Sequence, residues 1–183
     1  MGQRFRWGHI NVNVTDLDRS IVFYRELGFE MFRPDIPYLG LEAAQSSTVS
    51  QGVAQALAVP QNVQGRACIM QLGKGLPKLD LTEFASQDPH LPLQNQDLGL
   101  VRLCLVSEDL QADYQQLVRR GVEFLAPPSV CTDRMAEVAI CKDPDGTLIE
   151  LLQVHLDRWP RAPQPAQPKN NRDSSNIIHP SRR

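Results

Sequence analysis

The feature that most constrains the fold is an internal repeat. Residues 9–30, HINVNVTDLDRSIVFYRELGFE, align without a gap with residues 102–123, RLCLVSEDLQADYQQLVRRGVE, at an offset of 93. Only four of the 22 aligned positions are identical, so the shared pattern matters more than the identity. A repeat of this kind indicates one supersecondary unit that is used twice and buries its apolar face against its neighbour.

Each copy begins with an alternating segment that predicts a strand. The first copy turns three apolar residues to one side and three polar residues to the other, namely Ile10, Val12 and Val14 against His9, Asn11 and Asn13. In the second copy Leu103 and Leu105 take the apolar side. Arg102 there stands at the position that His9 holds in the first copy.

A helix follows each of these strands. Asp16 and Asp109 are the N-cap candidates that open the two helices. Apolar residues then recur at helical spacing, as Leu17, Ile21 and Tyr24 in one copy and Leu110, Tyr114 and Leu117 in the other. Gly28 and Gly121 stand where each helix ends and a left-handed residue is favoured.

Each copy closes with further strands. In the second, residues 135–155 predict a hairpin that turns at DPDG, and in the first, residues 65–85 predict a strand, a glycine turn and a strand. The segments KLDLT and LIELL match, which places Asp80 over Glu150. The unit is therefore strand–helix–strand–strand–strand. Because one helix covers one face of each sheet, we expect the opposite faces of the two sheets to meet and line a cavity. The first copy also carries an insertion at 37–65 with room for a short helix.

Composition narrows the class of protein. The chain has 183 residues, 42% of them hydrophobic and 22% charged, with a net charge of −2, which suits one domain and provides no basic surface for nucleic acid. No apolar run approaches the roughly 18 residues of a membrane span, and the first residues lack the apolar stretch of a secretory leader. The four cysteines form no C-x-x-C motif and predict reduced core thiols in a cytoplasmic protein, namely Cys68, Cys104, Cys131 and Cys141.

The repeat resembles the vicinal oxygen chelate superfamily, which includes glyoxalase I, extradiol dioxygenases, methylmalonyl-CoA epimerase and the fosfomycin and bleomycin resistance proteins. The resemblance covers about residues 5–155 and rests on four motifs, WGHINVNVTDLDRSIVFYRELGFEM, LPKLDLTEF, EDLQADYQQLVRRGVEF and KDPDGTLIELLQ. It implies an α+β fold in which two tandem βαβββ modules form a curved, open mixed-sheet barrel around a central cavity. The modules would span about 5–88 and 97–155. The remainder, 156–183, is rich in Pro, Gln, Asn and Arg, and we expect disorder after about Trp159.

In metal-binding relatives a His or Gln starts the first strand of each module, and a carboxylate lies in the last strand. The resemblance therefore implies His9, Asp80 and Glu150 as metal ligands. Arg102 takes the place of the second His, and it stays protonated and has no lone pair to give. Three donors would suit Fe(II), Mn(II), Ni(II) or Zn(II), but the guanidinium repels a cation and competes for the carboxylates. The charge of Arg102 therefore weighs against a bound metal.

Two interpretations of Arg102 stay open. It is either an ion-pair partner of Asp80 or Glu150 in an inert remnant of the site, or an anion hook for an acidic ligand. In the second case Asn11 and Asn13 add substrate-binding groups on the same strand face. Glu150 would then be a catalytic general base and Arg102 a catalytic stabiliser of negative charge.

The function predicted is a small-molecule lyase or isomerase of the glyoxalase type that acts through an enolate-like intermediate, with or without the usual metal. The alternative is a metal-free binding protein of the resistance type. Its cleft would draw on aromatic residues, namely Trp7, Phe23, Phe32, Tyr38, Phe84 and Phe124. Extradiol ring cleavage is disfavoured because Arg102 removes one of its histidines. The expected partner is a small, acidic molecule, with neither nucleic acid nor membrane. Relatives commonly form homodimers, but two modules in one chain also allow a self-contained site.

Four other residues are of types that bind metals but are expected away from this site. Glu83 lies three positions after Asp80, so strand alternation puts its side chain on the opposite face. His90, His155 and His179 are expected at the surface, in a loop, at a strand end and in the tail.

Overall fold

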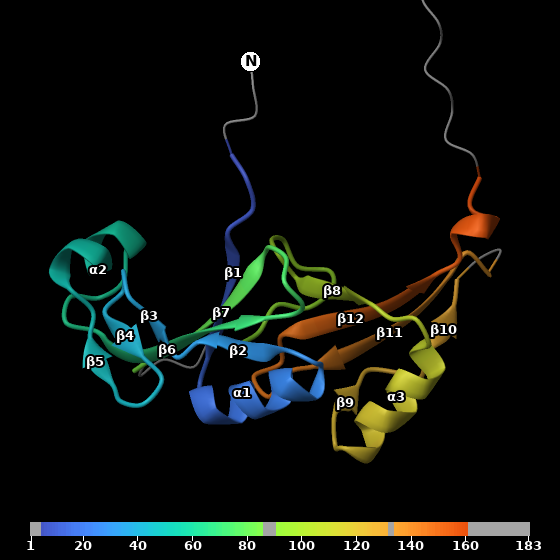
Figure 1. Ribbon diagram of the computed structural model, residues 1–183, viewed down its shortest axis with the longest axis horizontal. Coiled ribbons are helices and arrows are strands. Elements are labelled where there is room, and N and C mark those ends of the chain that lie inside the picture. Colours follow the sequence, from blue (N-terminus) through green and yellow to red (C-terminus); the bar gives the residue numbers. More distant parts are fainter. Residues whose placement is uncertain (1–4, 86–90, 132–133, 161–183) are drawn as a thin grey trace, which may run out of the picture.

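A computed structural model describes residues 5–85, 91–131 and 134–160 of the chain. The first module contains β1 (His9–Val14), α1 (Leu17–Glu26), β2 (Glu30–Arg33), β3 (Asp35–Ile36), β4 (Leu41–Glu42), β5 (Ser47–Thr48), α2 (Gln51–Leu57), β6 (Gln64–Gln71) and β7 (Lys78–Phe84). The second contains β8 (Arg102–Val106), α3 (Leu110–Arg119), β9 (Glu123–Phe124), β10 (Ser129–Val130), β11 (Ala136–Lys142) and β12 (Leu148–Val154). The predicted unit is therefore present twice (Figure 1).

The two sheets share one topology. In the first the strand order is β1-β7-β6-β2, and in the second it is β10-β11-β12-β8, with β5 and β9 as short additions on β6 and β11. Each module pairs its first strand parallel to its last, β1 with β7 and β8 with β12. This pairing confirms the predicted α+β architecture, and it brings the start of each module beside its closing strand.

The helix caps agree with the sequence. Asp16 accepts a hydrogen bond from the backbone N–H of Arg19, and Asp109 accepts one from Ala112, each at 3.0 Å. Gly28 and Gly121 follow the helices with φ of +89° and +90°, a conformation that glycine adopts without strain.

Both helices share a second N-terminal cap that was not predicted from the sequence. The first helical N–H of α1, on Leu17, donates to Glu83 Oε2 at 2.7 Å. The matching N–H of α3, on Leu110, donates to Gln153 Oε1 at 2.8 Å. Glu83 therefore lies on the helix side of its sheet, as predicted, where it holds the start of α1.

Helices α1 and α3 lie along the same side of the two sheets and share one hydrophobic core (Figure 1). That core takes buried residues from both modules, including Leu17, Tyr24, Leu81, Leu110, Cys141 and Ile149. Polar contacts join the modules too. The Tyr24 hydroxyl donates to Asp143 at 3.1 Å, and the Thr15 N–H donates to Asp145 at 3.0 Å. The hairpin turn of the second module thus rests on the first.

The insertion changes how the first sheet is covered. Its helix, α2, confirms the short helix expected there, and with β3–β5 it forms a second core of Ile36, Leu39, Leu41, Val49 and Ala54. This core packs on Ala67 and Ile69 of β6, whose register partners on β7 are Thr82 and Asp80. The insertion, instead of the second sheet, therefore covers this part of the face that carries Asp80. The apolar side chains of the insertion are buried against the first sheet. The expectation that this part of the first sheet meets the second sheet is therefore wrong.

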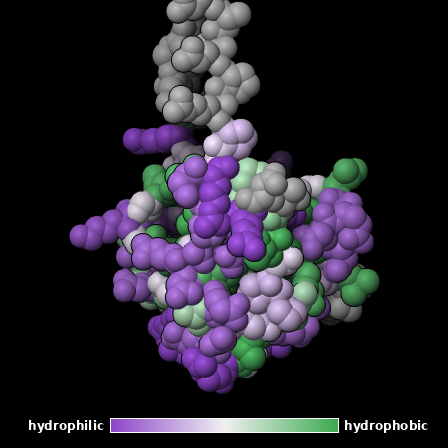
Figure 2. Space-filling model, turned by 90° about the vertical axis from the view of Figure 1, so that its right-hand side faces the viewer, coloured by the Kyte–Doolittle hydropathy of each residue, from purple (hydrophilic) through white to green (hydrophobic). Residues whose placement is uncertain are grey.

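The end of the molecule formed by the second module is mostly hydrophilic, with apolar residues scattered over it (Figure 2). The predicted tail begins with an ordered turn, Leu156–Arg158, where the Trp159 indole N–H donates to the carbonyl of Met135 at 3.1 Å. Residues 161–183, where disorder was expected, lie outside the described residues. Within the described residues no helix is both long and apolar enough to cross a membrane.

The cysteines divide into two classes, so the prediction of four core thiols is wrong for two of them. Cys68 and Cys141 are buried, whereas Cys104 and Cys131 are exposed. Cys104 is exposed because it faces away from Leu103 and Leu105, which point to the helices.

Thiol labelling should reveal this division. Burial raises the pKa of the Cys68 and Cys141 thiols to about 12, so we expect neither to react with iodoacetamide at pH 8. Peptide mass spectrometry of the folded protein should show label on Cys131 and Cys104 only. Labelling in urea should add the other two, and their modification before unfolding would contradict the structure.

Candidate functional site

His9 and Asp80 form the polar pair of the first module. His9 opens β1, and the parallel register sets Asn11 beside Asp80 on β7, so all three side chains share one face of the sheet. His9 Nδ1 lies 3.6 Å from Asp80 Oδ2. The imidazole is 45% exposed and the carboxylate 2%, so a half-exposed histidine stands beside a buried acid.

Asp80 is an acid without hydrogen bonds. Neither carboxylate oxygen accepts a hydrogen bond from any described residue. Burial raises the pKa of Asp80, and the nearby His9 acts in the opposite sense. Leaving such a group buried costs about 1–3 kcal/mol or more, because the water lost on folding is not replaced. Groups kept at that cost are typical of functional sites.

Several hydrogen-bonding groups surround the pair. The Tyr38 ring stacks on His9 at 6.5 Å between centroids, and burial together with Asp80 raises the pKa of the Tyr38 phenol. This phenol therefore stays protonated and can donate. Thr82 Oγ1 donates to Asn11 Oδ1, and Asn11 Nδ2 donates to Asn13 Oδ1, both at 2.9 Å. The amides of the predicted substrate-binding residues thus form a short chain along this face.

Arg102 and Glu150 form the equivalent pair of the second module. Cys104 is the register partner of Glu150, as Asn11 is of Asp80, so the two pairs occupy matching positions. Arg102 Nε donates to Glu150 Oε2 at 2.6 Å, and Nη1 donates to Asn95 Oδ1 at 3.2 Å. This hydrogen bond to Glu150 raises the pKa of Arg102. Of the two interpretations of Arg102, the ion pair is therefore present, with Glu150 as its partner and partly open to solvent.

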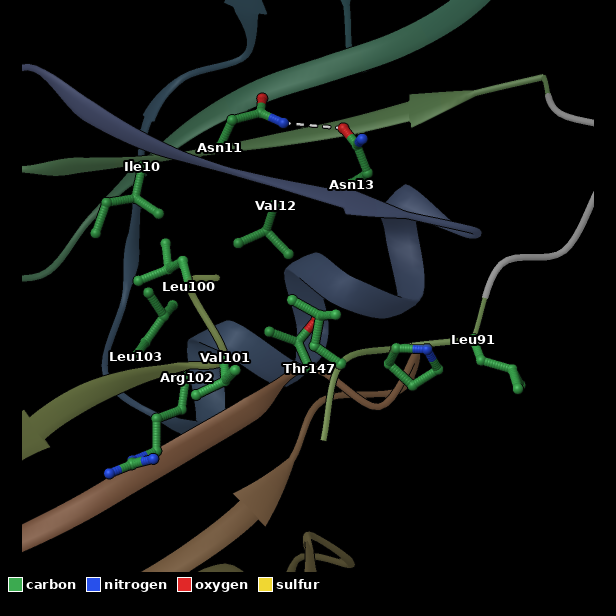
Figure 3. A pocket seen from close by; sticks show the side chains of 12 residues that line it. Ile10, Asn11, Val12, Asn13, Leu91, Leu100, Val101, Arg102, Leu103 and Thr147 are labelled. Carbon is green, nitrogen blue, oxygen red and sulfur yellow. Dashed lines mark hydrogen bonds between the residues drawn. The ribbon is translucent and has the colours of Figure 1, made fainter. Parts of the chain in front are cut away.

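A pocket of about 390 Å³ lies between the edges of β1 and β8. Ile10 and Val12 point into it together with Leu103, while Asn11 and Asn13 lie on the other side of β1 (Figure 3). The guanidinium of Arg102 points away from both amides. Most of the residues that line this pocket are apolar, with Arg102 among the polar ones, and His9, Asp80 and Glu150 do not line it.

Of the three predicted metal ligands, the structure brings two together, His9 and Asp80. Among residues 5–85, 91–131 and 134–160, no three His, Cys, Asp or Glu side chains gather into a group that could hold an ion. His9 and Asp80 are two neighbouring donors, while a guanidinium occupies Glu150. A catalytic zinc ion usually keeps three protein ligands. The predicted triad of His9, Asp80 and Glu150 stays a prediction, and the geometry favours chemistry carried by the side chains themselves.

His155 does not join the pairs. His155 Nε2 lies 3.5 Å from Glu137 Oε1 at the far end of the second sheet, and His90 and His179 lie outside the described residues. The position of Tyr38 beside His9 could not be predicted from the sequence, because the insertion that carries Tyr38 shows no periodic pattern.

Comparisons with known proteins agree on the fold. A sequence model of the Glyoxalase/Bleomycin resistance protein/Dioxygenase superfamily matches residues 6–151. A lactoylglutathione lyase of Pseudomonas aeruginosa is 28% identical over 165 residues, which cover 85% of this chain and 86% of that protein.

Solved structures extend this likeness. A glyoxalase family protein from Bacillus cereus has a TM-score of 0.64 at 17% identity, over 84% of this chain and 96% of that one. Glyoxalase I from Leishmania major has a TM-score of 0.53 at 21% identity, over 81% and 86%. Glyoxalase I from Zea mays has a TM-score of 0.57 at 20% identity over 81% of this chain, which spans 44% of the maize protein. At these identities the likeness concerns the fold.

Proposed function

Since the chain belongs to the glyoxalase/bleomycin resistance protein/dioxygenase superfamily, we propose that it is a glyoxalase-type lyase or isomerase that acts on a small carbonyl compound through an enolate-like intermediate. The observation that carries this proposal is Asp80, a buried carboxylate whose oxygens have no hydrogen bond and whose pKa burial raises. A carboxylate in that state is a stronger base than one in water. His9, which lies beside this carboxylate, is half-exposed and forms the solvent-facing side of the pair.

The chemistry follows from this arrangement. Asp80 takes a proton from the carbon next to a carbonyl group, and the electron pair of the C–H bond moves onto the carbonyl oxygen. The Tyr38 hydroxyl, and His9 when it is protonated, donate hydrogen bonds to that oxygen. The hydroxyl group on the deprotonated carbon gives its proton to that oxygen, and Asp80 then returns the first proton to the former carbonyl carbon, which gives an isomer with the same atoms. For a hemithioacetal of a 2-oxoaldehyde, the product of this shift is a thioester of a 2-hydroxy acid.

The second pair, Arg102 and Glu150, does not supply the general base in this proposal. Glu150 accepts a short hydrogen bond from Arg102, so it is less free than Asp80 to take a proton. The base therefore moves from Glu150, the residue predicted from the sequence, to its counterpart in the first module. The roles of Arg102 as anion hook, and of Asn11 and Asn13 as substrate-binding groups, remain predictions.

The test is an isomerase assay with methylglyoxal and glutathione, chosen because of the likeness to the Pseudomonas aeruginosa lyase. We expect formation of S-lactoylglutathione at a rate that a chelator leaves unchanged, because the reaction uses side chains alone. Arg102→Ala should lower the rate less than loss of Asp80. Tight binding of hemithioacetals with no turnover of any would overturn the proposal and support the alternative, a binding protein without catalysis.

A further inference from the structure

Four side chains form a row along the outer end of the first sheet. His9 and Lys78 are register partners in the parallel β1–β7 pair, so their side chains lie next to each other on one face. The ring of Tyr38 stacks on His9, and Lys78 Nζ lies 4.6 Å from the centroid of Phe32. These contacts join Tyr38 to His9 and Lys78 to Phe32, and we call the four side chains the Lys78 row.

The ammonium group of Lys78 has an uncharged hydrogen-bond partner, whereas two arginines on the same sheet are paired with carboxylates. Its Nζ donates to Gln71 Oε1 at 2.7 Å, and its side chain is half-buried. Among the ion pairs formed by residues 5–85, 91–131 and 134–160, none involves Lys78. By contrast, Arg33 and Arg66 on the same sheet each hold a carboxylate. An ammonium held in place without a counter-charge is suited to receive an anion from a ligand.

The two rings of the row are unusually open for aromatic side chains. Phe32 is 49% exposed and Tyr38 58% exposed. Each already contacts a member of the row, so both rings are oriented and leave surface for a flat or apolar group. The row thus combines one cation with two partly exposed aromatic rings, one against His9 and one against Lys78.

The spacing connects this row to the reacting group. Lys78 and Asp80 alternate with Leu79, so they point to the same face of β7. At about 3.3 Å per residue their Cα atoms are roughly 6.6 Å apart. Lys78 and Asp80 thus start from neighbouring positions on one face, and the Lys78 ammonium extends from there to Gln71 and Phe32.

We propose that Lys78 binds the carboxylate of the substrate, and that Phe32 and Tyr38 flank its body. The substrate class is a small carbonyl acid that carries an aryl or similarly flat apolar group. The reaction of that substrate rests on the proposed function, whereas its binding requires only the Lys78 row.

Isothermal titration calorimetry with phenylacetate, a probe that cannot react, tests the binding. We expect phenylacetate to bind at least tenfold more tightly than acetate, which lacks the ring, and than phenylacetamide, which lacks the charge. Lys78→Met should weaken phenylacetate binding at least tenfold, because it keeps an apolar stem against Phe32 and removes the ammonium. The matched control is Lys74→Met, which removes the same charge from the exposed β6–β7 loop and should leave binding unchanged.

Two other variants distinguish anion binding at Lys78 from catalysis by Asp80 and from anion binding at Arg102. Asp80→Asn should bind phenylacetate at least as well as the wild type, so a failed isomerase assay would leave the Lys78 result standing. Arg102→Ala should bind it unchanged. The inference is overturned if phenylacetate does not bind, if phenylacetamide binds as well, or if Arg102→Ala loses binding while Lys78→Met retains it. Thermal melting of Lys78→Met within a few degrees of the wild type establishes that its fold is intact.

Discussion

Replacing Asp80 with Asn should make the protein more stable and nearly inactive. We expect the free energy of unfolding to rise by about 1–3 kcal/mol at pH 7, because a buried charge without hydrogen bonds is removed at almost constant shape. The long contact to the half-exposed His9 that is lost contributes less than this. The isomerase rate should fall about 100-fold or more, as for loss of a general base. Urea unfolding and the thioester assay measure the two effects.

The gain in stability should depend on pH in a defined direction. Because burial raises the pKa of Asp80, the folded protein binds this proton more tightly than the unfolded chain does. The carboxyl therefore stabilises the fold most below its unfolded pKa of about 3.9, and this contribution is lost as pH rises through the folded pKa. The stability advantage of Asp80→Asn over the wild type should therefore increase as pH rises through that window. An equal gain at all pH values would mean that packing, and not charge, is the cause; Asp157→Asn, at an exposed position, is the control.

Replacing Asp143 with Ala should have the largest destabilising effect, about 3 kcal/mol or more. Its buried carboxylate accepts hydrogen bonds from the N–H groups of Asp145 and Thr147, at 3.0 and 2.7 Å, and from the Tyr24 hydroxyl at 3.1 Å. Alanine would leave these three donors without a partner, and each orphaned buried group costs about 1–3 kcal/mol.

Chemical denaturation should show this loss directly. Asp145→Ala is the matched control two residues along the same turn, where the carboxylate accepts from exposed Thr15 and Arg19, and we expect it to cost about 1 kcal/mol. Similar losses in the two variants would mean that the turn, and not the buried bond to Tyr24, holds the modules together.

Much of the fold could be predicted from the sequence because the repeat is local and periodic. The aspartate caps, the glycines after α1 and α3, and the match of His9 with Arg102 each depend on residues close together in the chain. The match of Asp80 with Glu150 needed only the alternation of two strands. These features follow from backbone geometry, which the pattern of residues reports well.

The covering of the first sheet could not be predicted in the same way. The insertion has no repeat and little periodicity, so nothing in it indicated that it would pack on β6 or bring Tyr38 to His9. The exposure of Cys104 could not be predicted from the sequence for a related reason. Its strand alternates apolar residues on both faces, and only the three-dimensional structure distinguishes the covered face from the open one.

The two modules carry different polar pairs but depend on each other for stability. Their shared core and the contacts of Tyr24 and Thr15 with the second-module turn leave neither half a complete interior of its own. We therefore expect the chain to unfold in one cooperative transition, so that a destabilising substitution in one module lowers the stability of both. One folding unit therefore holds two polar pairs at matching positions, a histidine beside a buried carboxylate in the first module and an arginine bound to a carboxylate in the second.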